Sequence, residues 1–441
     1  MDFWIRAAQL LLSLSILVVL HEFGHFIPAR LFKTRVEKFY LFFNWKFSLF
    51  KKKIGETEWG IGWIPLGGYV KIAGMIDESM DKDQMAKDPE PWEFRSKPAW
   101  QRLIIMVGGV VVNLILGFFI YMMVLFFWGT EDVKTNDLKY GFHADEIAQN
   151  IGFETGDKIV SVDGEALDNV LDINRHLMLR SVEKVVVDRA GEQEIINVPE
   201  DFGTQMWQAN VMQPFTPRVY ANVGGLVEGG NAEKAGLLEN DSIVKVNGYT
   251  FTFYDEFFDL LRDSIGDDVK LEFYRDGNLQ SLELKKDSTG KIGVAPDYSA
   301  GSTYQRHEHT YSFGQAISGG FAYGYWTLHD YVAQFKYLFT KKGATSMGGF
   351  GALGKLFPAT WDWKIFWLNT ALISIILAFM NILPIPALDG GHVVFLLYEI
   401  ITGKEAPQKV LEYAQYIGFF LILGLVLFAN GNDIYRAIFG G

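Results

Sequence analysis

The sequence predicts a polytopic α-helical membrane protein of mixed class, with four transmembrane helices and a long polar region between the second and the third. Apolar stretches long enough to cross about 30 Å of hydrocarbon occur at residues 5–30, 103–128, 365–398 and 410–429. The connection from Gly129 to His309 is polar and repeats itself. Because this part dilutes the apolar parts, the mean hydropathy is only +0.10. We therefore interpret membrane and polar parts separately.

The first span carries His21-Glu22-Phe23-Gly24-His25 within an otherwise apolar run. Ionisable groups inside a span cost several kcal/mol and are by default functional. On a helix, positions i and i+4 share a face, so both imidazoles can reach one zinc ion, with Glu22 beside them to activate a water molecule. The alternative is a chance pair of structural histidines. The chain contains no cysteine. Any metal must therefore be held by histidine, aspartate or glutamate.

The stretch 30–53, between the first two spans, is strongly basic, with Glu37 as the single acid among eight bases. Bases near span ends mark the cytoplasmic side, so the polar region 129–309 and both termini are expected outside and the histidine motif toward the cytoplasmic end. The net charge of −12 argues against a nucleic-acid partner, and none is expected. The bases are Arg30, Lys33, Arg35, Lys38, Lys46, Lys51, Lys52 and Lys53.

The segment Trp59–Ile72 alternates, is rich in glycine and aromatic residues, and is too short and broken to span a bilayer. It predicts a membrane-reentrant β-hairpin. This segment completes a first region, residues 1–129, that also contains the second span. In that span Gly109, Asn113 and Gly117 lie on one helix face, where small residues allow close helix packing; a substrate contact by Asn113 is the alternative.

The polar region contains two copies of one pattern. Gly152 and Gly236 align at an offset of 84 residues, and each copy continues through an aspartate, an alternating strand and an Asp-Gly or Asn-Gly turn. The pattern resembles that of PDZ domains, which bind peptide ends by strand addition. Two tandem extracytoplasmic PDZ-like α+β domains are expected at 130–217 and 218–300; the alternative is that they only shield a site. Residues 301–364 then form an amphipathic membrane-surface linker.

The third span, within the last region 365–441, contains Pro384, Pro386 and a diglycine, which must break its helix. Broken helices at membrane depth are tolerated where they line a cavity inside the protein. Asp389, directly before the diglycine, is the best third metal ligand. Its alternative role is to cap the following half-helix, and His392 is the rival ligand. Asn381 could donate to an oxyanion or only satisfy freed backbone groups.

These motifs in this order resemble site-2 proteases of the RseP type, and the resemblance covers nearly the whole chain. Its departure is the segment Thr345–Gly354, which lacks the usual Ser-Gly-Pro. The resemblance rests on His21–His25, the two PDZ-like units, Asn381–Gly390, Ile64–Lys71, Lys97–Arg102 and Gly108–Gly117.

The resemblance implies an intramembrane zinc endopeptidase with Zn²⁺ held by His21, His25 and Asp389 and with Glu22 as general base. It implies that Asn381 contacts the substrate backbone. An edge strand of the hairpin would pair with an unwound substrate, and we predict that this strand binds through Gly60, Ile61, Gly62 and Trp63; the alternative is a hairpin that only plugs the bundle.

The same resemblance implies a multi-pass protein in the lipid bilayer of the bacterial inner membrane, with periplasmic PDZ domains gating access and the active site toward the cytoplasm. Expected substrates are single-span proteins such as anti-sigma factors or remnant signal peptides, shortened first by an upstream site-1 protease. One alternative is an inactive PDZ-bearing scaffold or chaperone, against which the intact Glu22 argues. The other alternative is a transporter, but the chain has no repeated set of spans that could form the two inverted halves of a transporter.

Overall fold

The computed structural model describes residues 2–65, 67–75, 88–263, 268–298 and 304–439. The chain forms two compact units, which we describe separately: unit 1 comprises Met1–Gly129 and Thr310–Gly441, and unit 2 comprises Thr130–His309. The expected boundary between residues 300 and 301 lies outside the described residues.

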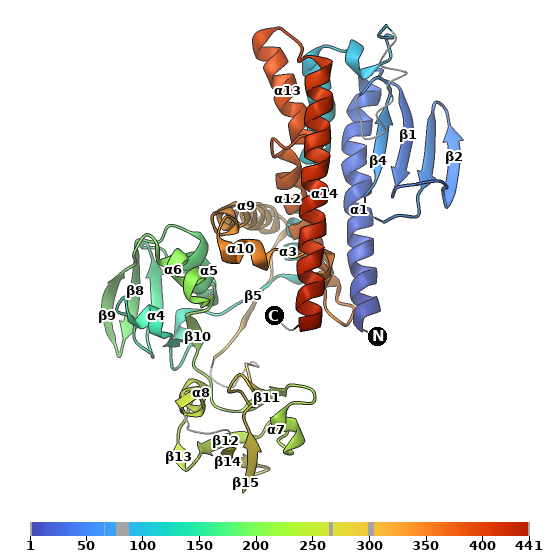
Figure 1. Ribbon diagram of the computed structural model, residues 1–441. Coiled ribbons are helices and arrows are strands. Elements are labelled where there is room, and N and C mark those ends of the chain that lie inside the picture. Colours follow the sequence, from blue (N-terminus) through green and yellow to red (C-terminus); the bar gives the residue numbers. More distant parts are fainter. Residues whose placement is uncertain (1, 66, 76–87, 264–267, 299–303, 440–441) are drawn as a thin grey trace. The chain divides into compact units, whose positions relative to one another are not determined.

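Unit 1 is built on long helices (Figure 1). Four of the described helices are long and apolar enough to cross a membrane, as the sequence predicts: α1 (Asp2–Leu31), α3 (Ala99–Trp128), α12 (Trp363–Ile382) and α14 (Gln408–Phe439). Helix α3 packs against α1, α12, the shorter α13 (Asp389–Thr402) and α9 (Phe313–Leu338). α1 begins and α14 ends at the same end of the unit, in agreement with an even number of crossings (Figure 1).

Glycines allow the close approach of α3 to its neighbours. A Cβ atom on Gly24 of α1 would lie 2.7 Å from the Gly109 Cα, and one on Gly117 would lie 2.7 Å from Ile375 Cγ1 of α12. Such distances are shorter than real Cβ contacts, so larger residues would push the helices apart. The predicted small-residue packing face of the second span is thus confirmed.

The third apolar stretch is interrupted as its prolines predict. Helix α12 ends at Ile382 and α13 begins at Asp389. Between them Ala387 adopts a positive φ of 76°. The diglycine fits the turn closely, since a Cβ on Gly391 would lie 2.7 Å from the Ile385 carbonyl oxygen.

The segment Trp59–Ile72 does not form the expected two-stranded hairpin. It contributes β3 (Thr57–Ile61) and β4 (Tyr69–Ile72), which are separated by β1 (Val36–Leu41) in a sheet of order β2-β3-β1-β4, with β2 at Phe50–Ile54. β1 pairs in parallel with β3 and antiparallel with β4. The physical reason is that β1 is largely buried and takes a central place, where both of its edges are paired, whereas the exposed β2 lies at an edge.

Shorter helices complete unit 1. α9 begins with a capping box between Ser312 and Gln315 and packs its Gly320 on Met122 of α3. Asp433 of α14 accepts hydrogen bonds from the backbone of Gly349 at 2.9 Å and of Ala352 at 3.0 Å, and so holds the glycine-rich segment in place. The remaining elements are a 3-10 turn η1 (Phe94–Ser96), α10 (Lys341–Ser346) and α11 (Phe350–Lys355).

Unit 2 has two hydrophobic cores that follow one another along the chain. The first is formed by residues between Val133 and Val219 together with Tyr304, and the second by residues between Ala221 and Ile292. The elements of the first half are β5 (Thr130–Asp132), η2 (Thr135–Asp137), β6 (Phe142–Ala144), α4 (Glu146–Gln149), β7 (Lys158–Val162), η3 (Val170–Asp172), α5 (Ile173–Leu179), β8 (Lys184–Arg189), β9 (Glu192–Asn197), α6 (Phe202–Ala209) and β10 (Phe215–Pro217).

From β6 on, the second half repeats the strand and helix succession of the first, apart from η3 and α6 in the first half and β13 in the second. Its elements are β11 (Val223–Leu226), α7 (Asn231–Lys234), β12 (Ser242–Val246), β13 (Tyr249–Thr250), α8 (Tyr254–Asp263), β14 (Asp268–Arg275), β15 (Asn278–Lys285) and β16 (Val294–Pro296). Strand β17 (His307–His309) then pairs with β5.

The repeat extends to a buried ion pair. Asp157 accepts two hydrogen bonds from Arg189, both at 2.8 Å. Asp241, at the equivalent place in the second half, accepts from Arg275 at 2.8 Å and 2.6 Å. Both aspartates are 1% exposed. The aspartate of the repeated motif therefore fixes the last residue of a following strand in each half.

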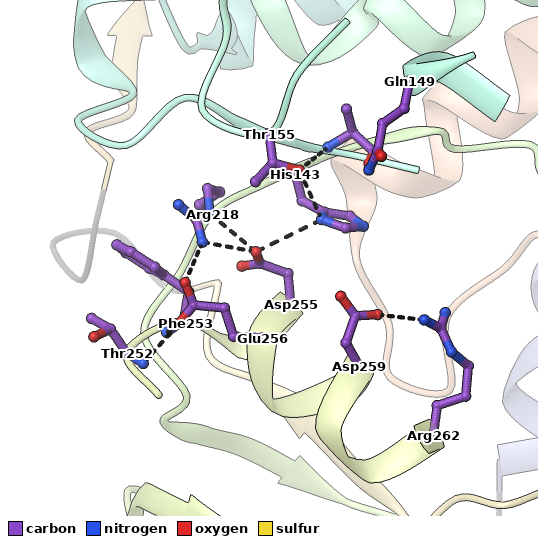
Figure 2. Close-up of polar contacts among 11 residues, drawn as sticks. His143, Gln149, Thr155, Arg218, Thr252, Phe253, Asp255, Glu256, Asp259 and Arg262 are labelled. Carbon is purple, nitrogen blue, oxygen red and sulfur yellow. Dashed lines mark hydrogen bonds and ion pairs between the residues drawn. The ribbon is translucent and has the colours of Figure 1, made fainter. Parts of the chain in front are cut away.

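A polar cluster joins the two halves of unit 2 (Figure 2). The Asp255 carboxylate on α8 forms an ion pair with the Arg218 guanidinium at 2.9 Å and lies 3.7 Å from Nδ1 of His143 on β6. The Glu256 carboxylate also forms an ion pair with Arg218, at 2.8 Å. The Arg218 guanidinium lies 4.0 Å from the centre of the Phe253 ring. Burial acts to raise the pKa of Asp255, but hydrogen bonds from His143 and Arg218 lower the pKa of this carboxyl below its ordinary value.

Candidate metal centre

The three predicted metal ligands converge, although they lie on different helices. The nearest ligand atoms of His21, His25 and Asp389 are all within 4.8 Å of one another. Asp389 Oδ2 is 3.4 Å from Nε2 of each histidine, and the two Nε2 atoms are 3.2 Å apart. Two nitrogens and one carboxylate oxygen leave a tetrahedral fourth position open, which is the donor set of catalytic zinc sites.

Neighbouring groups on α3 orient the two imidazoles. Nδ1 of His25 donates to the Ile105 carbonyl at 2.8 Å, which leaves the lone pair of Nε2 toward Asp389. The amide of Asn113 contacts Nδ1 of His21 at 3.2 Å. Asn113 Oδ1 is buried with no hydrogen-bond partner among the described residues, and a half-turn of the amide lets it accept from Nδ1. Both Nε2 atoms are then free to bind a metal.

Two further observations fit a metal at this place. Asp389 Oδ2 is buried and has no hydrogen-bond partner in the described part of the chain, a costly state for a carboxylate without a cation. A Cβ on Gly109 would overlap His25 Nε2 and lie 2.6 Å from His21 Cε1, so only glycine leaves room for both rings. The residue before α13, Leu388, provides its N-cap, and the carboxylate of Asp389 points to the histidines instead of capping the helix.

Glu22 lies beside these ligands at the edge of the sheet. Its side chain is 9% exposed, and the backbone N–H of Val70 in β4 donates to its carboxylate. Gly68, just before β4, packs against the same helix, since a Cβ there would lie 2.7 Å from Val18 and 3.5 Å from Glu22. The free edge of β4 therefore faces the glutamate of the motif.

A cavity of about 530 Å³ opens at this centre. Asn381 and His392 line it, as does the stretch from Gly68 to Ile72. His392 is not among the three residues whose ligand atoms converge, so the rival ligand is not part of this cluster. Lys38 of β1 and Gln415 of α14 also reach the cavity.

The residues predicted to form an edge strand lie elsewhere in the sheet. Gly60 and Ile61 belong to β3, which pairs with β1 on one side and β2 on the other, so this strand has no open edge. Gly62 donates to the Leu41 carbonyl at 2.8 Å and Trp63 to the Phe43 carbonyl at 3.1 Å. The prediction of an edge at residues 60–63 is wrong, because β1 occupies that place, and the strand with an open edge at the cavity is β4.

Sequence reasoning missed the parts played by Gly109, Asn113 and Val70. The spacing of Gly109 and Asn113 on one face of the second span was the available signal, and it predicted helix packing. Their approach to the histidines depends on how α3 is rotated against α1, which one helix alone does not determine.

Comparison with known proteins adds to this geometry. The family model described as Peptidase family M50 matches residues 9–425. The chain is 27% identical to the regulator of sigma E protease of Haemophilus influenzae, over 99% of this chain and 100% of the relative. It is 28% identical to protease RseP of Yersinia pestis, over 97% and 98%, and 28% identical over the same shares to a Neisseria meningitidis protein with a zinc metalloprotease name.

A family match over nearly the whole length agrees with the four apolar helices and with a centre of two histidines and an aspartate. The expected resemblance, the Zn²⁺ cofactor and the enzyme class are confirmed. The chain belongs to peptidase family M50 and is a multi-pass membrane zinc metalloprotease of the site-2 type.

Proposed function

We propose that His21, His25 and Asp389 hold the zinc ion and that Glu22 is the general base for hydrolysis of a peptide bond within the membrane. The observation that carries this proposal is the convergence of the three ligand atoms within 4.8 Å. When bound, zinc supplies a Lewis acid that activates water and polarises the scissile carbonyl.

The chain's own residues perform the remaining steps. Glu22 accepts a proton from the attacking water and returns it to the departing amine. The Ile105 carbonyl and the Asn113 amide keep both imidazoles oriented during this exchange. Asn381, which lines the cavity, donates a hydrogen bond to the substrate backbone.

The substrate segment is proposed to add as a strand to the free edge of β4. A helical segment in lipid has its peptide bonds protected by internal hydrogen bonds, so an enzyme must offer replacement partners. β4 offers them next to Glu22, because its Val70 N–H points to that carboxylate. In this arrangement Gly60, Ile61, Gly62 and Trp63 support the sheet: a Cβ on Gly60 would overlap the Tyr40 ring.

The wider setting extends the same proposal. The substrates are single-span membrane proteins, such as anti-sigma factors, or remnant signal peptides, which an upstream site-1 protease has shortened. The protein lies in the bacterial inner membrane, with the active site toward the cytoplasm and two periplasmic PDZ domains that limit access of bulky substrates. The name of the Haemophilus influenzae relative, a regulator of sigma E protease, supports anti-sigma factors as substrates. The basic connection 30–53 supports an active site toward the cytoplasm.

The proposal is tested by Glu22→Gln in the full-length protein, with a single-span substrate in detergent or liposomes. We expect cleavage to fall by about 10²-fold to 10⁴-fold, as for other general bases, while the zinc content measured by metal analysis stays near one per chain. Glu56→Gln, in the exposed turn after β2, is the matched control and should cleave normally. Full activity of Glu22→Gln would remove the general base from the mechanism.

A further inference from the structure

Lys38 of β1 is a cation at the catalytic cavity whose purpose the hydrolytic mechanism does not explain. It lines the cavity together with Glu22 and Asp389. Within the described ranges, no carboxylate lies within ion-pair distance of it. Its neighbour across the strands, Lys71, is paired with Glu37 at 3.5 Å. Lys38 is half-buried, and a half-buried ammonium without an anionic partner is destabilised until an anion joins it.

The sheet presents two different faces. Phe39 and Val70 turn toward α1, where Phe23 packs 4.8 Å from the Phe39 ring. Because side chains alternate along a strand, Lys38 and Lys71, which lie opposite each other, belong to the other face. Tyr40 and Tyr69 continue that face as stacked rings 5.4 Å apart.

A strand bound at the free edge of β4 would place every second side chain on the face of Lys38 and Lys71. Adjacent strands are about 4.8 Å apart, so the bound residue opposite Lys71 lies roughly 10 Å from the backbone of Lys38, two strands away. An extended lysine and a glutamate or aspartate side chain bridge this separation together. Lys71 already pairs with Glu37, whereas Lys38 forms no ion pair with a described residue. Glu58, its neighbour on β3, accepts a hydrogen bond from the Tyr40 hydroxyl at 2.7 Å.

We propose that Lys38 is a specificity-determining residue that binds the carboxylate of an acidic side chain in the substrate strand. This proposal rests on the proposed function, since it places the substrate on β4. It defines a substrate class: membrane segments that carry an aspartate or glutamate close to the scissile bond, at positions whose side chains share the face of Lys71. Acidic residues at the intervening positions turn toward α1 and do not contact Lys38.

The test is a substrate series in which glutamate, and in parallel glutamine, is moved one position at a time along the segment around the scissile bond. For the wild-type enzyme we expect kcat/KM to be about tenfold higher for glutamate than for glutamine at one position and at positions two residues from it. Lys38→Gln should abolish this preference, so that this variant cleaves the glutamate and glutamine substrates with equal kcat/KM at every position. Lys38→Arg should retain the preference, and Lys38→Glu should prefer a lysine at the same positions.

Lys51→Gln is the matched control, because Lys51 is an exposed lysine of β2 that does not line the cavity. Binding is measured separately in the Glu22→Gln background by photocrosslinking of the same substrates, and the glutamate preference should appear there too. A preference that survives in Lys38→Gln, or a wild-type enzyme that treats both series equally at every position, overturns the proposal. Cleavage by Glu22→Gln itself would instead contradict the general-base assignment, so the two failures are distinct.

Discussion

At the scale of single residues, the two imidazoles of α1 are oriented by groups of another helix, the Ile105 carbonyl and the Asn113 amide of α3. Two histidines four residues apart share a helix face wherever that helix lies, so this part of the site could be predicted from the sequence. The prolines before Asp389 likewise predict a broken span. The contact of Asn113 with His21, by contrast, exists only once α3 is packed at one rotation against α1. The role of Gly109 likewise cannot be predicted from α3 alone, because the imidazole atoms for which it leaves room belong to α1.

Gly109→Ala is predicted to remove zinc while leaving the helices assembled. The added Cβ would overlap His25 Nε2, and the ring cannot retreat because its Nδ1 is held by the Ile105 carbonyl. We expect zinc affinity, measured by competition with a chelator, to fall about 10-fold to 100-fold or more. Gly117→Ala is the packing control on the same helix face: its Cβ would lie 2.7 Å from Ile375 Cγ1 and 3.2 Å from the Ala371 carbonyl oxygen, with no histidine atom among its near neighbours, so zinc affinity should fall less. Equal zinc binding by both variants would contradict this account of Gly109.

At the scale of elements, the sequence predicted the helices better than the sheet. Apolar length is enough to find a span, and the third one is broken where its prolines are. The order β2-β3-β1-β4 could not be derived, because β1 belongs to the basic connection and pairs with two later strands, β3 and β4, that are not paired with each other. Strand pairing over such separations depends on contacts that no local pattern contains.

The cluster between β6 and α8 predicts a pH-dependent contribution to the stability of unit 2. The folded pKa of Asp255 lies below its ordinary value of 3.8, so the carboxylate stabilises the folded state above that pH and this stabilisation is lost as the pH falls through the folded pKa. At pH 7, Asp255→Asn should therefore destabilise unit 2 by about 2 kcal/mol, since charged hydrogen bonds are lost. The difference from wild type should shrink below about pH 4.

Thermal unfolding of the purified protein from pH 7 to pH 3 measures this difference. The control lies on the same helix (Figure 2): Asp259 pairs with Arg262 at 3.1 Å, but its side chain is 45% exposed. Asp259→Asn should leave the unfolding temperature almost unchanged at every pH, because exposed pairs contribute little. A constant effect of Asp255→Asn over the whole pH range would argue against an ionised Asp255.

At the scale of the whole molecule, the repeat in the polar region predicted two successive cores, and the structure has them. The aligned aspartates have the same function in both, since Asp157 and Asp241 each bind an arginine at the end of a later strand. What the sequence could not provide is the polar contact that joins the halves, because Arg218 and Asp255 have no counterpart in a repeat pattern.

Zinc should stabilise the whole of unit 1, because its proposed ligands belong to α1 and α13, which both pack on α3. A metal that binds only the folded state adds about 2.7 kcal/mol at one hundred times its Kd. We therefore expect a chelator to lower the unfolding temperature of the wild-type protein in detergent and excess zinc to restore it. His25→Ala should start lower and respond to neither addition. A wild-type unfolding temperature that ignores the chelator would contradict a zinc link between the helices.

The two chain segments that meet at the metal centre are made at very different times. The proposed ligands His25 and Asp389 are separated by 364 residues along the chain (389 minus 25). At about 5 to 20 residues per second, a ribosome needs roughly 20 to 70 s to travel from one to the other. Under the proposed ligand set, the nascent chain carries Glu22 and both histidines during that interval without the carboxylate of Asp389. The complete three-residue zinc site can therefore form only after Asp389 has been synthesised.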